Sequence, residues 1–228
     1  MNATGETTTF PRRDGSTASG YLALPAADAY GREDAGVVII HEALGLNEQI
    51  RGVADRFAAD GWRALAVDLF DGHVFATVAE ARPMVRSLDR TRALASIAAA
   101  VERLREGGGN VAVLGFCLGG ALSITAGVKV PGVSGVACFY GIPAIEEADP
   151  SQLRAPFIGH FANQDDWITP AKVDELEQQL KVAKVFFQIN RYDAQHAFFN
   201  QGRAEAYSEL DAQMAWDRTR DFFVNVLT

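Results

Sequence analysis

The stretch Gly115-Phe116-Cys117-Leu118-Gly119-Gly120 constrains this chain more than any other. It has the form G-x-C-x-G-G and directly follows the apolar run 111–114. An apolar run that ends in a glycine-flanked turn and is followed by a second apolar segment is typical of a strand leading into a helix. Small residues on both sides of the turn permit a strained backbone and close packing. The stretch therefore predicts an α/β arrangement with a thiol at the apex of a sharp turn.

Apolar runs and helical patterns alternate along the rest of the chain. Strands are expected at 7–10, 18–24, 36–40, 64–67, 111–114, 133–140, 155–161 and 184–188, and further helices at 47–60, 89–105, 170–181 and 202–226. Segment 71–84 contains the breakers Gly72 and Pro83, so we expect an irregular surface excursion there. The alternation predicts an α/β fold, with a mostly parallel central sheet and helices on both faces. No linker divides residues 1–228, so a single domain is expected.

The composition of the chain limits the kinds of partner that it is expected to bind. The chain has 21 basic and 29 acidic residues, a formal net charge of −8, which gives no support to a nucleic-acid role. No signal-like start and no apolar stretch long enough for a membrane are found. Two cysteines in such a chain are expected to remain reduced, Cys138 as a buried inert thiol. We expect a cytoplasmic protein that acts on a small molecule without a metal or other cofactor, as a monomer or small homo-oligomer.

Cys117 is the first candidate for chemistry. At a helix N-terminus, the positive end of the helix dipole favours a thiolate. The turn has the form of the nucleophile elbow of α/β-hydrolases, with cysteine in the place of serine. The alternative is a small apolar filler in an ordinary strand-to-helix turn. A thiolate nucleophile is also a good leaving group, so its use favours activated esters or lactones over amides.

Possible partners of this thiol follow in the chain order nucleophile, acid, base. Asp165 and Asp166 come after an apolar run, at the end where catalytic groups of parallel sheets gather. One or both aspartates could instead cap the helix that begins near Pro170. His196 is expected on a loop before the last helix, which makes it the favoured base. The remaining histidines are expected in the core or in solvent: His41, His73 and His160.

The end of the third expected strand supplies further candidates. Glu42 could tune the thiol, or it could simply interact favourably with a helix dipole. The backbone N–H groups of Ala43 and Leu118 are expected to form an oxyanion hole. Trp167 and Phe198 lie next to the proposed acid and base. Each could line a substrate pocket, and ordinary packing is an equal alternative.

The chain resembles the dienelactone hydrolase (carboxymethylenebutenolidase) family of α/β-hydrolases over nearly its full length. The motifs that carry this resemblance are His41-Glu42-Ala43-Leu44-Gly45-Leu46-Asn47, the stretch 115–120, Gln164-Asp165 and His196-Ala197-Phe198. The resemblance implies Cys117 as nucleophile, Asp165 as triad acid and His196 as base. It further implies that Glu42 contacts the resting thiol and moves when substrate binds. The implied reaction is hydrolysis of an enol lactone through a thioacyl-enzyme.

The chain departs from this family where the substrate carboxylate is expected to bind. An arginine expected after the histidine is Asn200, a second aligns with Val78, and an expected serine is Ala197. Cations could come from other positions instead, namely Arg51, Arg82 and Arg86, and Arg82 is our substrate-binding candidate. Two alternatives remain open: a broad carboxylesterase or thioesterase with the same triad, and a catalytically idle hydrolase fold that binds a ligand.

Overall fold

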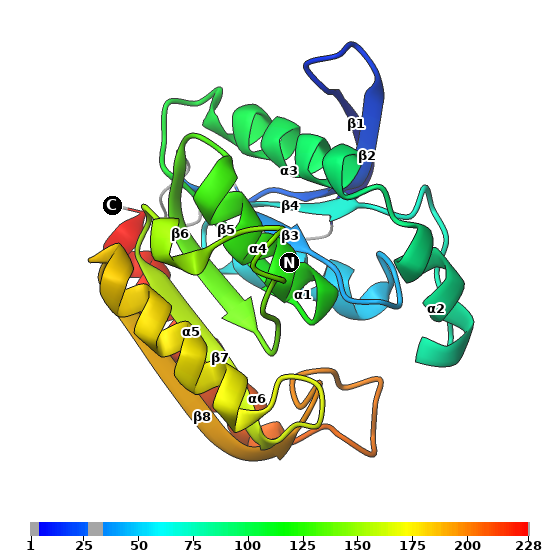
Figure 1. Cartoon of the computed structure of the whole chain (residues 1–228). Coiled ribbons are helices and arrows are strands. Elements are labelled where there is room, and N and C mark those ends of the chain that lie inside the picture. The colour runs from blue at the N-terminus through cyan, green and yellow to red at the C-terminus, as the bar shows by residue number, and fades with distance from the viewer. Residues whose placement is uncertain (1–4, 27–33, 228) are drawn as a thin grey trace.

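A computed structural model of the chain describes residues 5–26 and 34–227. An eight-stranded sheet runs through the molecule in the order β1-β2-β4-β3-β5-β6-β7-β8 (Figure 1). The strands are β1 (Glu6–Pro11), β2 (Thr17–Ala23), β3 (Gly36–Ile40), β4 (Arg63–Asp68), β5 (Val111–Phe116), β6 (Val133–Phe139), β7 (Phe157–Gln164) and β8 (Phe187–Gln195). The α/β-hydrolase fold expected from the sequence is confirmed.

The direction of the strands determines where a site can form. β1 pairs antiparallel with β2, and β2 antiparallel with β4, whereas all pairs from β4 to β8 are parallel. β3 lies between β4 and β5, so the order in which the chain adds strands reverses between β3 and β5. The crevice beyond the carboxyl ends of the strands at such a reversal is the usual ligand site of an open α/β sheet.

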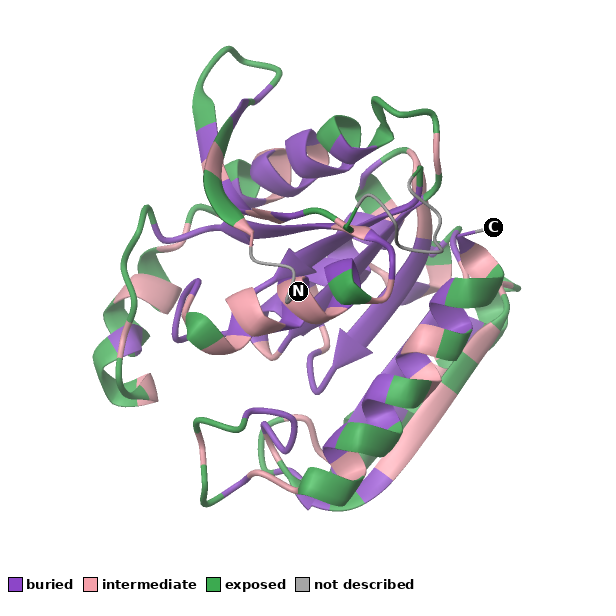
Figure 2. Cartoon of the chain, turned by 180° about the vertical axis from the view of Figure 1, so that it is seen from behind, coloured by how far each residue is buried: buried purple, intermediate pink, exposed green. Residues whose placement is uncertain are grey.

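Helices cover both faces of the sheet. In β3, Val37 and Ile39 enter one core and Val38 and Ile40 the other, as the two-residue repeat of a strand requires. The first core is closed by α1 (Glu48–Ala59) and α6 (Glu209–Val226), and the second by α3 (Arg90–Arg105), α4 (Leu118–Lys129) and α5 (Pro170–Ala183). The central strands are buried throughout (Figure 2). No helix in the described part of the chain has the length and apolarity to span a membrane.

The segment expected to be irregular contains a helix instead. α2 (Val78–Ser87) begins after Thr77, whose side chain accepts a hydrogen bond from the Glu80 N–H. Pro83 lies inside α2 rather than ending it. Ala81 is its one fully buried residue, and it packs into a small cluster with Ala43. α2 therefore projects from the sheet (Figure 1) and covers the edge at which β3 ends.

Two elements near the C-terminus differ from the sequence expectation. The strand expected at 184–188 lies later, because Lys184 ends α5 in the left-handed conformation (φ 59°) and β8 then continues to Gln195. The last helix starts at Glu209 rather than at residue 202. Residues 196–208 thus form a compact loop of turns, and His196 follows the end of β8 directly.

Candidate active site

Cys117 occupies the turn between β5 and α4 with a backbone φ of 52° and ψ of −110°. Its N–H donates to the Phe139 carbonyl at 2.9 Å, which fixes the turn against β6. A Cβ on Gly115 would lie 1.9 Å from the Gly119 carbonyl oxygen, and one on Gly119 would lie 2.2 Å from the Ile40 carbonyl oxygen. These contacts exclude any side chain at the two positions. The glycines of the motif therefore allow the sharp turn that presents the partly exposed thiol.

Asp165 and His196 meet at the carboxyl ends of β7 and β8. The His196 Nδ1–H donates to Asp165 Oδ2 over 2.6 Å. The other oxygen, Oδ1, accepts the N–H groups of Trp167 at 2.8 Å and Ile168 at 2.9 Å. The Asp165 side chain is fully buried, whereas Asp166 is exposed. Of the two aspartates, the structure thus brings Asp165 to the histidine.

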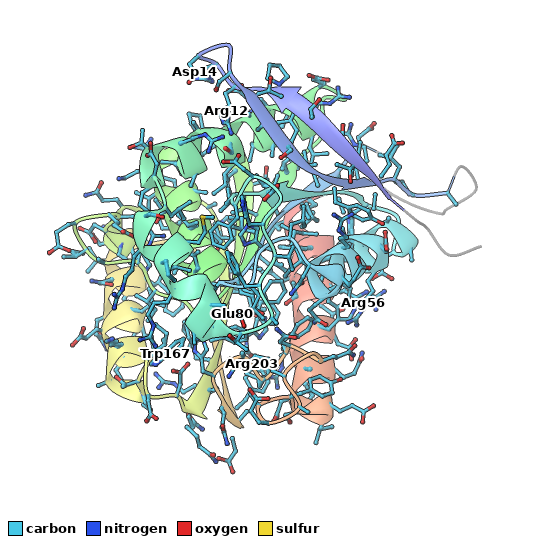
Figure 3. All side chains as sticks on the ribbon, turned by 90° about the vertical axis from the view of Figure 1, so that its right-hand side faces the viewer. Arg12, Asp14, Arg56, Glu80, Trp167 and Arg203 are labelled. Carbon is cyan, nitrogen blue, oxygen red and sulfur yellow. The ribbon has the colours of Figure 1, made fainter. Side chains whose placement is uncertain are left out.

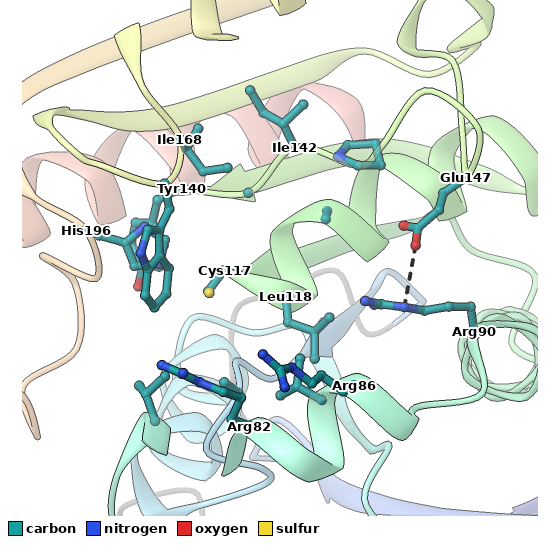
Figure 4. Close-up of a pocket in the computed structure, with 17 residues that line it drawn as sticks. Arg82, Arg86, Arg90, Cys117, Leu118, Tyr140, Ile142, Glu147, Ile168 and His196 are labelled. Carbon is teal, nitrogen blue, oxygen red and sulfur yellow. Dashed lines mark ion pairs between the residues drawn. The ribbon is translucent and has the colours of Figure 1, made fainter. Parts of the chain in front are cut away.

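His196 lines the same cavity as the Cys117 thiol. Its Nε2 is buried and has no hydrogen-bond partner of ordinary geometry among the described residues. The sulfur of Cys117 points to the side of the cavity where His196 lies (Figure 4). Burial lowers the pKa of His196, but Asp165 and Cys117 outweigh burial and raise this pKa to about 9. Burial would raise the pKa of Asp165, but the hydrogen bond and charge of His196 and the N–H groups of Ile168 and Trp167 outweigh burial and lower this pKa. The protonated imidazolium is thus the favoured form of His196 near neutral pH.

Glu42 has its hydrogen-bond partner on the loop that follows β8. Its side chain is buried, and the Asn200 amide donates to its Oε1. Burial raises the pKa of Glu42, and Asn200, Arg203 and His196 partly offset this rise. No hydrogen bond joins Glu42 to Cys117 among the described residues. Asn200, at the position where the family resemblance predicts an arginine, therefore binds this carboxylate.

Two backbone N–H groups are available to a ligand beside the thiol. Leu118 is the first residue of α4, and the first N–H groups of a helix have no partner within it. Ala43 follows β3 in the adjacent loop. Neither N–H has an acceptor among the described residues, and both residues line the same cavity as Cys117. Their position fits the expected oxyanion hole.

The cavity at the thiol has a volume of about 460 Å³. Its wall is mainly apolar and includes Val85, Leu118, Ile142, Pro143 and Ile168. α2 contributes the guanidinium groups of Arg82 and Arg86, which face Cys117 across the cavity (Figure 4). Neither has an ion pair or hydrogen bond among the described residues. Arg90, by contrast, forms an ion pair with Glu147 at 3.6 Å.

The two aromatic candidates have different positions. Trp167 lines the cavity, is 51% exposed, and its ring centroid lies 4.8 Å from that of His196. In Figure 3, Trp167 and Arg203 lie below Glu80, a residue of α2. Phe198 is fully buried, packs on Tyr140 and Tyr192, and does not line the cavity. Phe198 is therefore a core residue, and the expectation that it contacts substrate is wrong.

The remaining candidates lie away from the thiol. Arg51 is on α1, over the ring of Tyr21. His41 and His160 are buried with both ring nitrogens bonded. Cys138 is buried, donates to the Gly141 carbonyl, and has a pKa raised to about 12 by burial. No group of three potential metal-ligating side chains occurs among the described residues.

Sequence reasoning missed two contributions and left a third without a position. Arg86 is a possible cation from the sequence, but an irregular segment at 71–84 gives it no place in the cavity. Tyr140, which packs against His196 at 5.0 Å between ring centroids, looked like any strand residue. Asn200 was noted only as a missing arginine, and its pairing with Glu42 joins residues 158 positions apart. The spacing of Arg82 and Arg86, four residues apart, is the sequence signal that could have placed both on one face of a helix over 78–87.

Known proteins resemble this chain in sequence and in fold. The dienelactone hydrolase family model matches residues 18–227. Protein usf of Aquifex pyrophilus is 30% identical, over 95% of this chain and 96% of that protein. A Bradyrhizobium sp. protein named "Probable 2-oxo-3-(5-oxofuran-2-ylidene)propanoate lactonase" is 27% identical, over 90% and 88%. The solved structure of a dienelactone hydrolase-like promiscuous phosphotriesterase from metagenomic libraries has the same fold, with a TM-score of 0.82 at 21% identity, over 99% of this chain and 100% of that one. This chain belongs to the dienelactone hydrolase family.

Proposed function

We propose that this protein hydrolyses small carboxylic esters or lactones through a thioacyl-enzyme. The observation that carries the proposal is the Asp165–His196 hydrogen bond of 2.6 Å beside the Cys117 thiol, in a cavity with two free backbone N–H groups. Nucleophile, base, orienting acid and oxyanion donors are the parts that acyl transfer requires. A lactonase name among the relatives supports lactones as one substrate class.

Acylation begins with the Cys117 thiolate. Its sulfur attacks the substrate carbonyl carbon, a C–S bond forms, and the carbonyl π electrons move to oxygen. The N–H groups of Ala43 and Leu118 stabilise that oxyanion. The C=O bond then re-forms, the ester C–O bond breaks, and the His196 imidazolium protonates the departing oxygen. In a lactone this oxygen stays attached to the acyl group.

Deacylation uses the same groups in reverse. His196, now neutral, takes a proton from water as the water oxygen attacks the thioester carbonyl. The tetrahedral adduct collapses, the C–S bond breaks, and the acid product leaves. The thiolate and the imidazolium are regenerated. Asp165 holds His196 in one orientation throughout and stabilises its charge.

The cavity favours an acyl group that carries an acid. Its wall is mainly apolar, and Arg82 and Arg86 of α2 have no ion pair with any residue that the structure describes, so a carboxylate on the substrate would satisfy both. This carboxylate site would use Arg82 and Arg86, because Asn200 is engaged with Glu42. Trp167 would cover the substrate beside His196. We therefore propose an acidic ester or lactone as the preferred substrate.

Glu42 is proposed to control the thiol. While the Glu42 carboxylate is hydrogen-bonded to Asn200, Cys117 is free to interact with His196. A move to the thiol would replace that interaction and place a carboxyl group beside the sulfur. The position on Asn200 is thus the one that fits a reactive thiolate.

Intact-mass analysis during turnover tests the proposal. The chain is mixed with activated esters, lactones, thioesters and an aryl amide, and the matched control is Cys117→Ala. We expect an acyl mass on the native chain, none on the variant, and the slowest turnover on the amide. An acyl mass that persists in Cys117→Ala would refute the nucleophile. A native chain that turns over nothing and alkylates no faster than free cysteine would favour the idle fold.

A further inference from the structure

His41 holds the peptide between Glu42 and Ala43 from the side away from the cavity. Its Nδ1 lies 2.7 Å from the Glu42 carbonyl oxygen, and the Leu69 N–H donates to its Nε2 over 3.1 Å. Because Nε2 accepts a hydrogen bond from a backbone amide, the ring proton must be on Nδ1. Nδ1–H therefore donates to the Glu42 carbonyl. A single neutral tautomer satisfies both ring nitrogens.

That hydrogen bond also fixes the N–H of Ala43. The carbonyl of Glu42 and the N–H of Ala43 belong to one planar trans peptide, in which they point in opposite directions. The Gly45 N–H donates to the same carbonyl at 3.2 Å, so the oxygen is held by two donors. Donors on a carbonyl also polarise the peptide and strengthen its N–H as a donor.

His41 itself is rigidly placed. It is fully buried, follows β3, and packs edge-on against Phe70 with ring centroids 4.7 Å apart. Leu69 and Phe70 follow β4, the parallel neighbour of β3. Burial lowers the pKa of His41 and outweighs the opposing effect of its hydrogen bond to the Glu42 carbonyl, so the ring stays neutral. The ring thus links the ends of two strands to the peptide that faces the thiol.

We propose that His41 is a positioning residue for the oxyanion hole, acting through the Glu42–Ala43 peptide. It does not touch substrate. Its task is to hold the Ala43 N–H at the angle at which the developing oxyanion of the acyl transfer accepts it. This inference rests on the proposed function, since it assigns a means of stabilising the same transition state.

Two amide substitutions separate the two ring nitrogens. In His41→Asn, the side-chain amide nitrogen falls near Nδ1 and can still donate to the Glu42 carbonyl. In His41→Gln, the amide reaches the position of Nε2 and can accept from Leu69, but it leaves the carbonyl without this donor. We expect His41→Gln to lower kcat for an activated ester about 10- to 100-fold with little change in KM, and His41→Asn to stay within about 3-fold of the native kcat.

Alkylation of Cys117 by iodoacetamide is the control, because this displacement creates no oxyanion. Its rate should remain native in both variants. Equal losses of kcat in the two variants, or a parallel fall in alkylation, would overturn the role of His41 while the hydrolase function stands. A native chain that hydrolyses no ester or lactone would instead refute the proposed function and this inference together.

A measurement on the native protein covers the case in which neither variant folds. Long-range ¹H–¹⁵N NMR spectra distinguish the two tautomers of a neutral histidine. We expect the proton of His41 on Nδ1. A proton on Nε2 would leave the Glu42 carbonyl without this donor and would overturn the inference.

Discussion

Asp165 uses its two carboxylate oxygens for different partners, and this division determines what the residue can tolerate. Oδ2 accepts from His196, and Oδ1 accepts from the N–H groups of Trp167 and Ile168. All these partners are donors, so both oxygens must be acceptors. The helix-capping alternative is wrong for Asp165, because both of its backbone donors precede α5 and the N-cap of that helix is Thr169.

Asp165→Asn should therefore inactivate the enzyme without unfolding it. If the amide oxygen keeps the two backbone donors, the NH₂ group faces His196 and pushes the ring proton to Nε2, where the ring can no longer accept a proton from water. We expect kcat to fall by about 10³- to 10⁴-fold. The matched control is Asp166→Asn at the neighbouring exposed position, which should retain native kcat. Equal losses in the two variants would contradict this account.

The pairing of Asn200 with Glu42 allows a second test at the scale of single residues. In Asn200→Leu the buried Glu42 carboxyl loses its donor, which raises its pKa further and leaves a polar group unsatisfied. We expect the free energy of unfolding to fall by about 1–3 kcal/mol in urea titrations. The exposed neighbour in Gln201→Leu is the control and should change little. A native midpoint in Asn200→Leu would show that the hydrogen bond contributes nothing.

Local sequence was sufficient for part of this site. The glycines around Cys117 restrict the backbone, and the order of Asp165 and His196 along the chain matches the order of the strand ends that meet. The partner of Glu42 could not be predicted in this way. Asn200 reaches it from a loop whose path depends on turns such as the positive φ of Ala197, and no periodic pattern encodes these turns.

At the scale of elements, α2 is the part of the fold proposed to set specificity. It carries Arg82 and Arg86 one helical turn apart, so both guanidinium groups reach the same cavity. It also contributes Val78 and Val85 to the wall. It contacts the rest of the molecule through the small cluster around Ala81 and Ala43, and through Met84 and Val85, which pack against the second core. Changes at the exposed Arg82 and Arg86 should therefore alter substrate choice with little effect on stability.

The double variant Arg82→Gln, Arg86→Gln tests this role. We expect KM for an ester with a carboxylate on its acyl group to rise about 10- to 100-fold, because two charge-assisted contacts are lost. KM for the neutral ester of the same size should stay unchanged. Arg51→Gln on α1 serves as the matched control. Equal increases for both esters would contradict a carboxylate site.

The sequence misassigned α2 for an identifiable reason. Gly72 and Pro83 were both treated as breakers, but Gly72 lies before the helix. Pro83 removes a single N–H from a helix that is mostly solvent-exposed, where water can satisfy the freed carbonyl. The start of β8 was missed similarly, because the left-handed conformation of Lys184 ends α5 without a glycine. The buried strands around the site were predicted well because burial on both faces requires apolar runs.

At the scale of the whole molecule, His160 ties the last strand and helix to the sheet. Arg218 donates to the Tyr192 hydroxyl, and this hydroxyl lies 2.8 Å from His160 Nδ1. His160 Nε2 lies 2.9 Å from Thr219 Oγ1, whose own proton goes to the Ala215 carbonyl. The His160 ring is neutral within this row of hydrogen bonds. Burial, together with the charge of Arg218, lowers the pKa of His160 to about 3.

This network predicts how stability depends on pH. A histidine with a pKa of about 3 when folded and about 6.5 when unfolded binds more protons in the unfolded state between these values. Its effect on stability is absent above pH 6.5, and stability is lost as pH falls toward 3. From pH 6 to pH 4, the native chain should lose roughly 2 kcal/mol more than His160→Gln in urea titrations. Gln201→Leu, which changes an exposed side chain that carries no titrating group, should match the native slope. Parallel curves for the native chain and His160→Gln would contradict the assignment.

Cys117 and Cys138 differ in exposure, so the number of thiols that react per chain reports whether that chain is folded. Cys117 is partly exposed, whereas the thiol of Cys138 is buried and donates to the Gly141 carbonyl. A disulfide reagent should titrate one thiol per native chain and two per unfolded chain. The slow second equivalent then measures how often β6 opens to solvent. A fast second equivalent without denaturant would contradict this. In any preparation, a single labelling curve would separate inactive but folded molecules from those that have lost their fold.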